Sequence, residues 1–299
     1  MARCARRAQR GVAFVLVLWV IALVTILLGS FALIARTENL QARHLFDSVR
    51  ARYAAEAGLN RAVYELRNPD PQLRWTGDGR PYEFEFEGAR VSVSLTDESG
   101  KVDINVADAT MLKALFVGSG VEEARAEALA DAIVDWRDPD DMTSPHGAEE
   151  PEYRAAGLPY KPKNGPFDTV GEVQQVLGMD YATFQRIEPA VTLYSGSGQP
   201  NPGFAPIEVL RALPGVSEEL ARSIVAQRQA VPPGQPTGLT LPDGTPVMAG
   251  GGGLTYSIQS RATLPGGAST LLDATVRLGG ANPAGRPFVI LRWRDGENS

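Results

Sequence analysis

The first 35 residues constrain the fold of this chain more than any other feature. The leader before Gly11 carries four positive charges, on Arg3, Arg6, Arg7 and Arg10. The next 24 residues, from Val12 to Ala35, include no charged side chain. At a rise of about 1.5 Å per residue, a helix of this length reaches roughly 36 Å, which exceeds a hydrocarbon core of about 30 Å. The sequence therefore predicts a membrane-spanning helix.

The flanking charges predict how this helix is oriented. The arginines precede it, whereas Arg36 and Glu38 follow it without a positive excess. The positive-inside bias then places the N-terminus in the cytoplasm and exports about 260 residues. A cleaved secretory signal is one alternative, because Ser30-Phe31-Ala32 offers small residues at a suitable spacing. However, the apolar run is longer than the usual signal core of about 7–15 residues, and a cut after Gly11, in front of the helix, is the other alternative.

Composition fits an exported, anchored protein and argues against a nucleic-acid partner. Cys4, the one cysteine of the sequence, lies in the leader, so the exported part has no disulfide. Removing residues 1–11 takes away four arginines and no acids, which changes the net charge from −6 to −10. A surface this acidic repels phosphate backbones.

Hydrophobic periodicity organises the remaining chain. Apolar side chains at spacings of three and four predict a helix from Glu38 to Arg67, which Asn68-Pro69-Asp70-Pro71 ends. Alternation by two predicts a hairpin over 82–87 and 90–96, and three more strands over 254–262, 270–278 and 287–293. Helical patterns occupy 107–117, 121–136, 169–177, 180–187, 206–212 and 217–229. Two strand groups around a helical block indicate one sheet interrupted by an insertion.

The segments divide as follows: leader 1–11, membrane helix 12–35, helix and first strands 36–104, helical insertion 105–230, Gly/Pro-rich loop 231–253 and last strands 254–299. The Gly/Pro-rich loop, with five prolines and four consecutive glycines, is expected to be a mobile linker.

The insertion contains a pattern typical of helix-hairpin-helix motifs. Residues 209–225 read as a helix, a Pro214-Gly215 turn and a second helix capped by Ser217, and 167–191 and 106–136 resemble further copies. Such hairpins bind DNA phosphates in many proteins, so a membrane-anchored, exported helix-hairpin-helix binding module is an alternative function. Residues 101–200 hold 17 acids and eight bases, which argues against DNA and favours a structural unit.

The densest polar cluster begins at the end of a predicted helix. Seven carboxylates fall within 18 residues, on Asp135, Asp138, Asp140, Asp141, Glu149, Glu150 and Glu152. Calcium accepts six to eight oxygen ligands, whereas zinc prefers the cysteines and histidines that this segment lacks except for His146. The residues alone leave a calcium site and a solvated acidic loop equally open. Two histidines and one leader cysteine support no catalytic triad, so we expect no enzyme.

Five segments together resemble one family, the general secretion pathway protein K family of minor pseudopilins of the type II secretion system. They are Arg10-Gly11-Val12, Ala54-Ala55-Glu56-Ala57-Gly58, the segment 97–105 (Asp-Glu-Ser-Gly-Lys-Val-Asp-Ile-Asn), the acidic loop with Gly147-Ala148-Glu149-Glu150, and 164–170 (Asn-Gly-Pro-Phe-Asp-Thr-Val). The resemblance covers nearly the whole chain.

This resemblance implies an α+β, type IV pilin-like fold: a long N-terminal helix packed on an antiparallel sheet, with a large helical (helix-hairpin-helix or SAM-like) insertion. It implies that a prepilin peptidase cuts between Gly11 and Val12 and that the new N-terminus is methylated. The helix then serves as a single-pass inner-membrane anchor, with the main domain in the periplasm.

The resemblance also implies a place in the pseudopilus, the periplasmic filament of the system. Most pilin-like proteins carry a glutamate at the fifth mature position, which is Leu16 here, and its absence suits a subunit at the filament tip. Implied partners are minor pseudopilins I and J, contacted through the helix stripe and a sheet edge, and the other pseudopilins. The tip would initiate assembly and support protein export. Family members bind Ca²⁺, which we carry over to Asp138, Asp140, Asp141, Glu149 and Glu150, and with less support to Asp135 and Glu152.

Overall fold

The computed structural model describes residues 11–233, 235, 237–247, 252–279 and 287–296. The leader before Gly11 and part of the Gly/Pro-rich loop, with the mobility expected for it, therefore fall outside the described residues.

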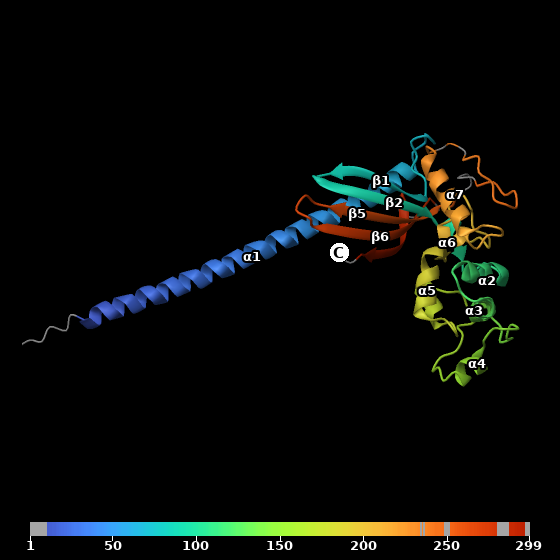
Figure 1. Ribbon diagram of the computed structural model, residues 1–299, viewed down its shortest axis with the longest axis horizontal. Coiled ribbons are helices and arrows are strands. Elements are labelled where there is room, and N and C mark those ends of the chain that lie inside the picture. The colour runs from blue at the N-terminus through green and yellow to red at the C-terminus, as the bar shows by residue number, and fades with distance from the viewer. Residues whose placement is uncertain (1–10, 234, 236, 248–251, 280–286, 297–299) are drawn as a thin grey trace, which may run out of the picture.

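A single helix, α1 (Gly11–Leu66), runs without interruption for 56 residues. Its N-terminal half projects away from the rest of the molecule, whereas its C-terminal third lies on the sheet (Figure 1). The face on the sheet consists mostly of alanines at spacings of three and four, namely Ala51, Ala54, Ala55, Leu59, Ala62, Val63 and Leu66. Small side chains let the helix approach the strands closely. The larger apolar side chains of the stripe predicted from the sequence, Phe46, Val49 and Tyr53, are exposed instead.

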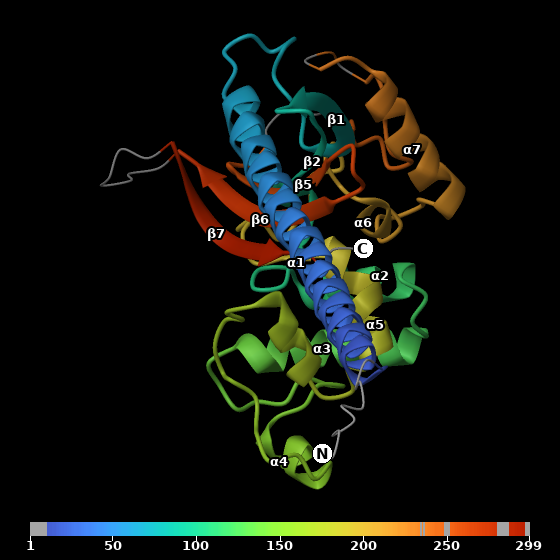
Figure 2. The same cartoon turned by 90° about the vertical axis from the view of Figure 1, so that its left-hand side faces the viewer.

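Five antiparallel strands form the main sheet in the order β1-β2-β5-β6-β7. They are β1 (Asp78–Phe86), β2 (Ala89–Asp97), β5 (Thr255–Thr263), β6 (Ser269–Leu278) and β7 (Phe288–Asp295). Pairing of β2 with β5, from Arg90 opposite Thr263 to Asp97 opposite Tyr256, joins strands that are more than 150 residues apart in the chain. The two groups of strands therefore form one sheet, and the chain leaves this sheet after β2 and returns to it at β5, as the alternation of apolar residues predicted. The helix α1 packs across β2, β5 and β6 (Figure 2).

The part between β2 and β5 is mostly helical. It contains η1 (Glu98–Gly100), β3 (Val102–Asp103), α2 (Ala109–Gly118), α3 (Glu123–Arg137), α4 (Glu150–Ala155), η2 (Val170–Gln175), α5 (Tyr181–Ile187), η3 (Glu188–Ala190), β4 (Val191–Thr192), α6 (Ile207–Leu210) and α7 (Glu218–Ala230). The predicted helix over 169–177 is only the short 3₁₀ turn η2. Helix α4 and the parallel pair of β3 with β4 are not in the sequence prediction, because elements of two to six residues show no periodicity.

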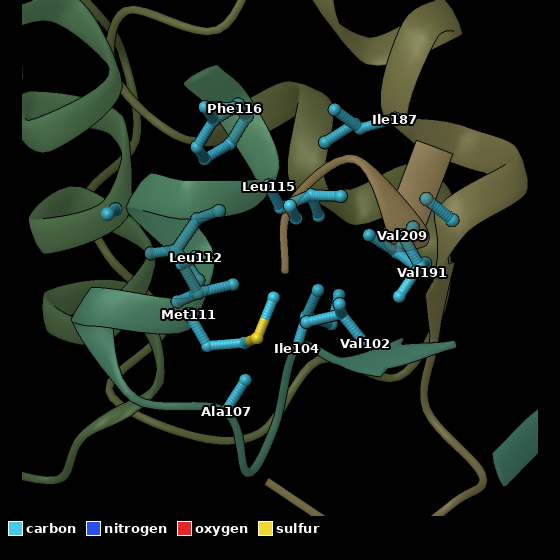
Figure 3. Close-up of a cluster of buried hydrophobic side chains, with 14 of the residues drawn as sticks. Val102, Ile104, Ala107, Met111, Leu112, Leu115, Phe116, Ile187, Val191 and Val209 are labelled. Carbon is cyan, nitrogen blue, oxygen red and sulfur yellow. The ribbon is translucent and has the colours of Figure 1, made fainter. Parts of the chain in front are cut away.

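The helical part has its own hydrophobic core, separate from that under α1. The core is built where α2 faces the strands β3 and β4 and the helices α5 and α6; Figure 3 shows Leu112 and Leu115 of α2 pointing toward Ile104, Ile187 and Val209. The Gly/Pro-rich loop contributes as well, since Leu241 and Val247 are buried in this core. These two residues of the loop therefore pack on the helices.

A buried polar joint connects the helical part to the sheet. The Asp97 carboxylate accepts hydrogen bonds from Ser99 N (2.8 Å) and from Gly253 N (2.9 Å), so it links the entry and exit of the insertion. Glu98 accepts from Ser257 Oγ on β5 (2.6 Å) and from the Thr192 hydroxyl on β4. Both carboxylates are buried, 0% and 2% exposed, and these hydrogen bonds link the helical part to the sheet.

Candidate functional site

The acidic loop lies between α3 and α4, at the end of the helical part away from α7 (Figure 1). Asp135 anchors it from the last turn of α3, where this side chain is fully buried. Both of its carboxylate oxygens accept a hydrogen bond from Ser144 N, at 3.1 and 3.2 Å. A Cβ on Gly147 would stand 2.0 Å from Asp135 Oδ2, so only glycine allows the loop to fold back over this carboxylate.

Three oxygens in this loop region are buried and accept no hydrogen bond: Asp138 Oδ1, Glu149 Oε1 and Asn164 Oδ1. Buried acceptors without a donor are uncommon in folded proteins because they lose the hydrogen bonds that water would supply. Here all three are hard oxygen atoms, two of them on carboxylates. This donor set fits a Ca²⁺ ion, which prefers carboxylate and amide oxygens.

The backbone and side chain of Asn164 are both constrained. Its φ of 49° lies in the left-handed region, which asparagine tolerates better than most residues. The side-chain nitrogen donates to Asp140 O at 3.0 Å and to Asp141 Oδ1 at 2.9 Å. These two bonds fix the orientation of the amide and leave its oxygen as the acceptor without a donor.

The pKa values of Glu149 and Asp138 are both raised, and these are the two carboxylates with an oxygen that accepts no hydrogen bond. Burial raises the pKa of Glu149 from 4.5 to about 7, and the negative charges of Asp135 and Asp138 add to the effect. Burial also raises the pKa of Asp138, together with the charges of Asp140 and Asp135. Carboxylates that disfavour their own charge in this way gain most from a bound cation.

The five predicted ligands differ in the contacts that their carboxylates make. Asp138 and Glu149 supply two of the oxygens without donors, and Asp141 holds the Asn164 amide. The Asp140 carboxylate accepts from Met142 N at 2.9 Å, while the side chain of Glu150 pairs with Arg154 and with Lys161, at 3.5 Å. Among the described residues, no three His, Cys, Asp or Glu side chains converge into a complete metal-ligand cluster. The ligand assignment therefore stays a prediction.

Asn164 is the residue that sequence reasoning missed as a candidate ligand. It stands 23 positions after Asp141, in the segment used only for the family resemblance. Its side-chain amide oxygen is of a type that binds Ca²⁺, and this was the one available signal. Nothing in the sequence spacing indicates that the segment of Asn164 approaches the acidic loop. Glu152 plays a different part, because its carboxylate accepts from Glu149 N at 2.9 Å and so orders the start of α4.

The second candidate element is the N-terminal half of α1. It is the one helix, among the described residues, that is long and apolar enough to cross a membrane. Its apolar side chains are exposed on all faces, including Leu16 at 60% and Trp19 at 73%. The described helix begins at Gly11, and nothing is described of the burial of Gly11 and Val12.

The hairpins of the helical part have the expected turns, and in two of them acidic side chains occupy the first backbone amides of the second helix. In two of the turns, Gly120 and Gly215 adopt φ values of +81° and +75°. The Glu122 carboxylate accepts from Ala124 N and Arg125 N at the start of α3. Asp180 likewise accepts from Thr183 N at the start of α5. Acidic side chains occupy the positions that a DNA phosphate would need, which disfavours the DNA-binding alternative.

Comparison with known proteins gives a family match for the middle of the chain. Residues 93–196 match the family model "Type II secretion system (T2SS), protein K". This match contains Asp97 and Glu98 of the buried polar joint, and the whole acidic loop with Asn164. The type II secretion system protein K of Pseudomonas aeruginosa is 27% identical over 249 residues, which is 75% of this chain and 73% of that protein.

The chain is therefore similar to protein K of type II secretion systems, in the family-model match over residues 93–196 and along most of its length. A second relative, protein K of Klebsiella pneumoniae, is 26% identical over 204 residues, or 61% of this chain and 62% of the relative. These relatives are components of secretion systems and indicate no catalytic activity.

A solved structure shows the same fold. A chain in the crystal structure of the GspK-GspI-GspJ complex from the enterotoxigenic Escherichia coli type 2 secretion system superposes with a TM-score of 0.52 at 19% identity. The superposition covers 88% of this chain and 99% of that chain. The α+β fold predicted from the sequence, a long helix on an antiparallel sheet with additional helices, is thereby confirmed. The exposed apolar half of α1 fits single-pass anchoring in the inner membrane, as expected of a protein similar to these secretion-system components.

Proposed function

We propose that this chain is the minor pseudopilin at the tip of the type II pseudopilus, where it initiates filament assembly and supports export across the outer membrane. The observation that carries the proposal is that the apolar half of α1 and the helical part lie at opposite ends of the molecule. The apolar half of α1 projects from one end of the molecule, while the helical part lies at the opposite end of the sheet (Figure 1). A pilin-like subunit stacked beyond that end would meet the helical part.

The neutral residue at position 16 supports the tip location. A glutamate there would have to be desolvated in the membrane or the filament core, which is unfavourable without a partner amine. The exposed Leu16 is compatible with the lipid and with packing against neighbouring helices, and it needs no partner ahead of it.

The processing of the N-terminus follows from the same role. A prepilin peptidase cuts between Gly11 and Val12 on the cytoplasmic side, the new amine is methylated, and the main domain stays in the periplasm. The continuous helix from Gly11 into the sheet-bound part supports a retained anchor, because cleavage within it would remove the segment that holds the chain in the membrane.

Minor pseudopilins I and J are the proposed partners. The structurally similar chain belongs to a complex with the corresponding proteins of its own system. In this chain the exposed apolar side chains of α1, including Phe46 and Tyr53, remain available for neighbouring helices.

Ca²⁺ is the proposed structural ion of the acidic loop. Asp138, Glu149 and Asn164 would hold it through the three oxygens without donors. The bound ion supplies positive charge that stabilises the loop between α3 and α4. Asp140 and Asp141 each use one carboxylate oxygen in a hydrogen bond, and Glu150 pairs with Arg154. None of these three side chains has a buried oxygen without a donor.

Two measurements on the producing bacterium test this function. N-terminal sequencing of the membrane-extracted protein is expected to begin at Val12. Deletion of the gene is expected to abolish secretion of type II substrates, and the full-length chain is expected to restore it. An intact Met1, a start near Leu33, or normal secretion by the deletion strain would contradict the proposal.

A further inference from the structure

Buried charges gather where β1 meets the C-terminal end of α7, two elements that pack against each other (Figure 2). A bulge between Asp78 and Pro81 interrupts the pairing of β1 with β2, and Arg80 lies within it. The Arg80 guanidinium pairs with the Asp78 carboxylate, with Nε 3.0 Å from Oδ1 and Nη2 2.7 Å from Oδ2. It also donates to Arg228 O at 2.7 Å and to Val231 O at 2.8 Å. Asp78 therefore neutralises the charge of Arg80.

Arg228, near the end of α7, forms no ion pair of its own with any carboxylate that the structure describes. Its side chain is 4% exposed. Its Nη atoms donate to backbone carbonyls, namely Pro202 O (3.3 Å), Ala205 O (2.8 Å) and Asp78 O (3.2 Å). Its Nε–H is buried and has no acceptor among the described residues. A donor left in this way loses the hydrogen bond that water would supply.

The charges at this place do not balance. Two guanidinium groups, of Arg80 and Arg228, face one carboxylate, of Asp78, which leaves a net charge of +1. Burial lowers the pKa of Arg228 from 12.5 to about 10; the Asp78 carboxylate opposes this effect and the Arg80 charge adds to it. Arg228 therefore stays charged at neutral pH, and a buried positive charge without a counter-ion is unfavourable.

A small cavity borders these groups. Its volume is about 20 Å³, and β1, α7 and the chain after α7 line it, with Asp78, Arg80 and Arg228 in its wall. A space of this size holds about one water-sized sphere. It is too small for a phosphate or for the carboxylate of another molecule, and its net positive charge disfavours a cation. The remaining occupants are one water molecule and one monatomic anion.

We propose that this cavity, the β1–α7 cavity, binds a chloride ion through Arg228 Nε. Charge distinguishes chloride from water here, because a water molecule would accept the hydrogen bond of Nε but leave the positive charge uncompensated. Chloride does both. The ion would join β1 of the sheet to α7 of the helical part, and it would stabilise the folded chain because the site exists only there. The site lies outside the proposed function and does not depend on it.

Thermal denaturation of the full-length chain in mild detergent tests this binding. Sodium chloride is compared with sodium gluconate at equal ionic strength, because gluconate screens charges but is too large for the cavity. At about 100 times the dissociation constant, chloride is expected to raise the ratio of folded to unfolded chain about 100-fold. The corresponding rise in melting temperature is about 5 °C or more. Equal melting temperatures in the two salts would overturn the proposal.

Two variants of α7 separate binding at the cavity from a general salt effect. Arg228→Gln removes the charge and the Nε donor, so the response to chloride is expected to disappear. Arg222→Gln, on the same helix, is the matched control: Arg222 is exposed and pairs with Glu218, and this variant is expected to respond as the wild type does. Equal responses of the two variants would show a general salt effect and overturn the proposal.

A measurement on the wild type keeps the test valid if Arg228→Gln fails to fold. Crystals of the full-length chain are grown in sodium bromide, and the anomalous signal of bromide locates the ion. A bromide peak within hydrogen-bond distance of Arg228 Nε is expected. Water alone in the β1–α7 cavity would overturn the proposal. A bromide peak without any chloride response in solution would mean an adventitious ion only, and it would overturn the proposal as well.

Discussion

Replacing Glu149 by glutamine is expected to change the stability of the chain in opposite directions with and without calcium. The carboxyl of Glu149 is 2% exposed, and one of its oxygens accepts no hydrogen bond. Without a cation, its negative charge is unfavourable beside Asp135 and Asp138. Glutamine keeps the shape and removes the charge, so it relieves this repulsion and also removes a calcium ligand.

The pKa gives the size of the effect. Burial, followed by the neighbouring carboxylates, raises the pKa of Glu149 from 4.5 to about 7. At about 1.4 kcal/mol per pKa unit, this corresponds to roughly 3 kcal/mol at most. Because the pKa is raised, the folded chain binds more protons than the unfolded chain between those pH values. The calcium-free wild type is therefore favoured below pH 4.5 and loses this stability as the pH rises through about 7.

Urea denaturation of the full-length chain in mild detergent, followed by tryptophan fluorescence, measures the change. At pH 8 with a chelator, Glu149→Gln is expected to be about 1–3 kcal/mol more stable than the wild type, and at pH 4.5 the two are expected to be nearly equal. With calcium at about 100 times its dissociation constant, the wild type is expected to gain about 2.7 kcal/mol, most of which the variant loses.

Glu150→Gln provides the matched control from the next position. Its carboxylate pairs with Arg154 and Lys161 at the surface, so the change is expected to stay below about 0.5 kcal/mol in chelator. Destabilisation of the chelated chain by Glu149→Gln at pH 8, or equal stabilisation of the wild type and this variant by calcium, would contradict this expectation.

Further substitutions probe the joint between α1, the sheet and the helical part. Gly58→Ala is expected to lose about 1–3 kcal/mol in thermal denaturation, because its Cβ would lie 2.1 Å from Ser260 Oγ; Gly29→Ala, with nothing within 4 Å, is expected to show no loss. Arg228→Met is expected to cost about 2–4 kcal/mol and to speed hydrogen exchange in α7, because Arg228 is 4% exposed and donates to Ala205 O (2.8 Å) and Asp78 O (3.2 Å). Unchanged exchange in α7 would show that this arginine does not hold the helix to β1.

The parts of the fold that the sequence predicts are those with a long local period. Alternation of Val91, Val93 and Leu95 predicted β2, and the apolar run after Gly11 predicted the start of α1. The two-residue strands β3 and β4 are not predictable in this way, since their pairing of Val102 with Val191 depends on the tertiary fold. Hydrophobic periodicity also failed to show which face of α1 packs on the sheet. The buried face consists mostly of alanines, which contribute less to a hydrophobic pattern than the exposed Phe46.

The candidate metal site shows the same limit. Carboxylate density indicated the loop but not which oxygens lack hydrogen-bond donors. That distinction depends on local partners, such as the pairing of Glu150 with Arg154, and on the approach of Asn164 from a distant segment. Neither is encoded in spacing along the chain.

Immunogold labelling of purified pseudopili tests the tip location most directly. Antibody against the helical part, residues 105–230, is applied to pseudopili assembled by the wild-type strain. A subunit at the tip is expected to give gold at one end of each filament. Gold distributed along the filaments, or filaments without any label, would contradict it.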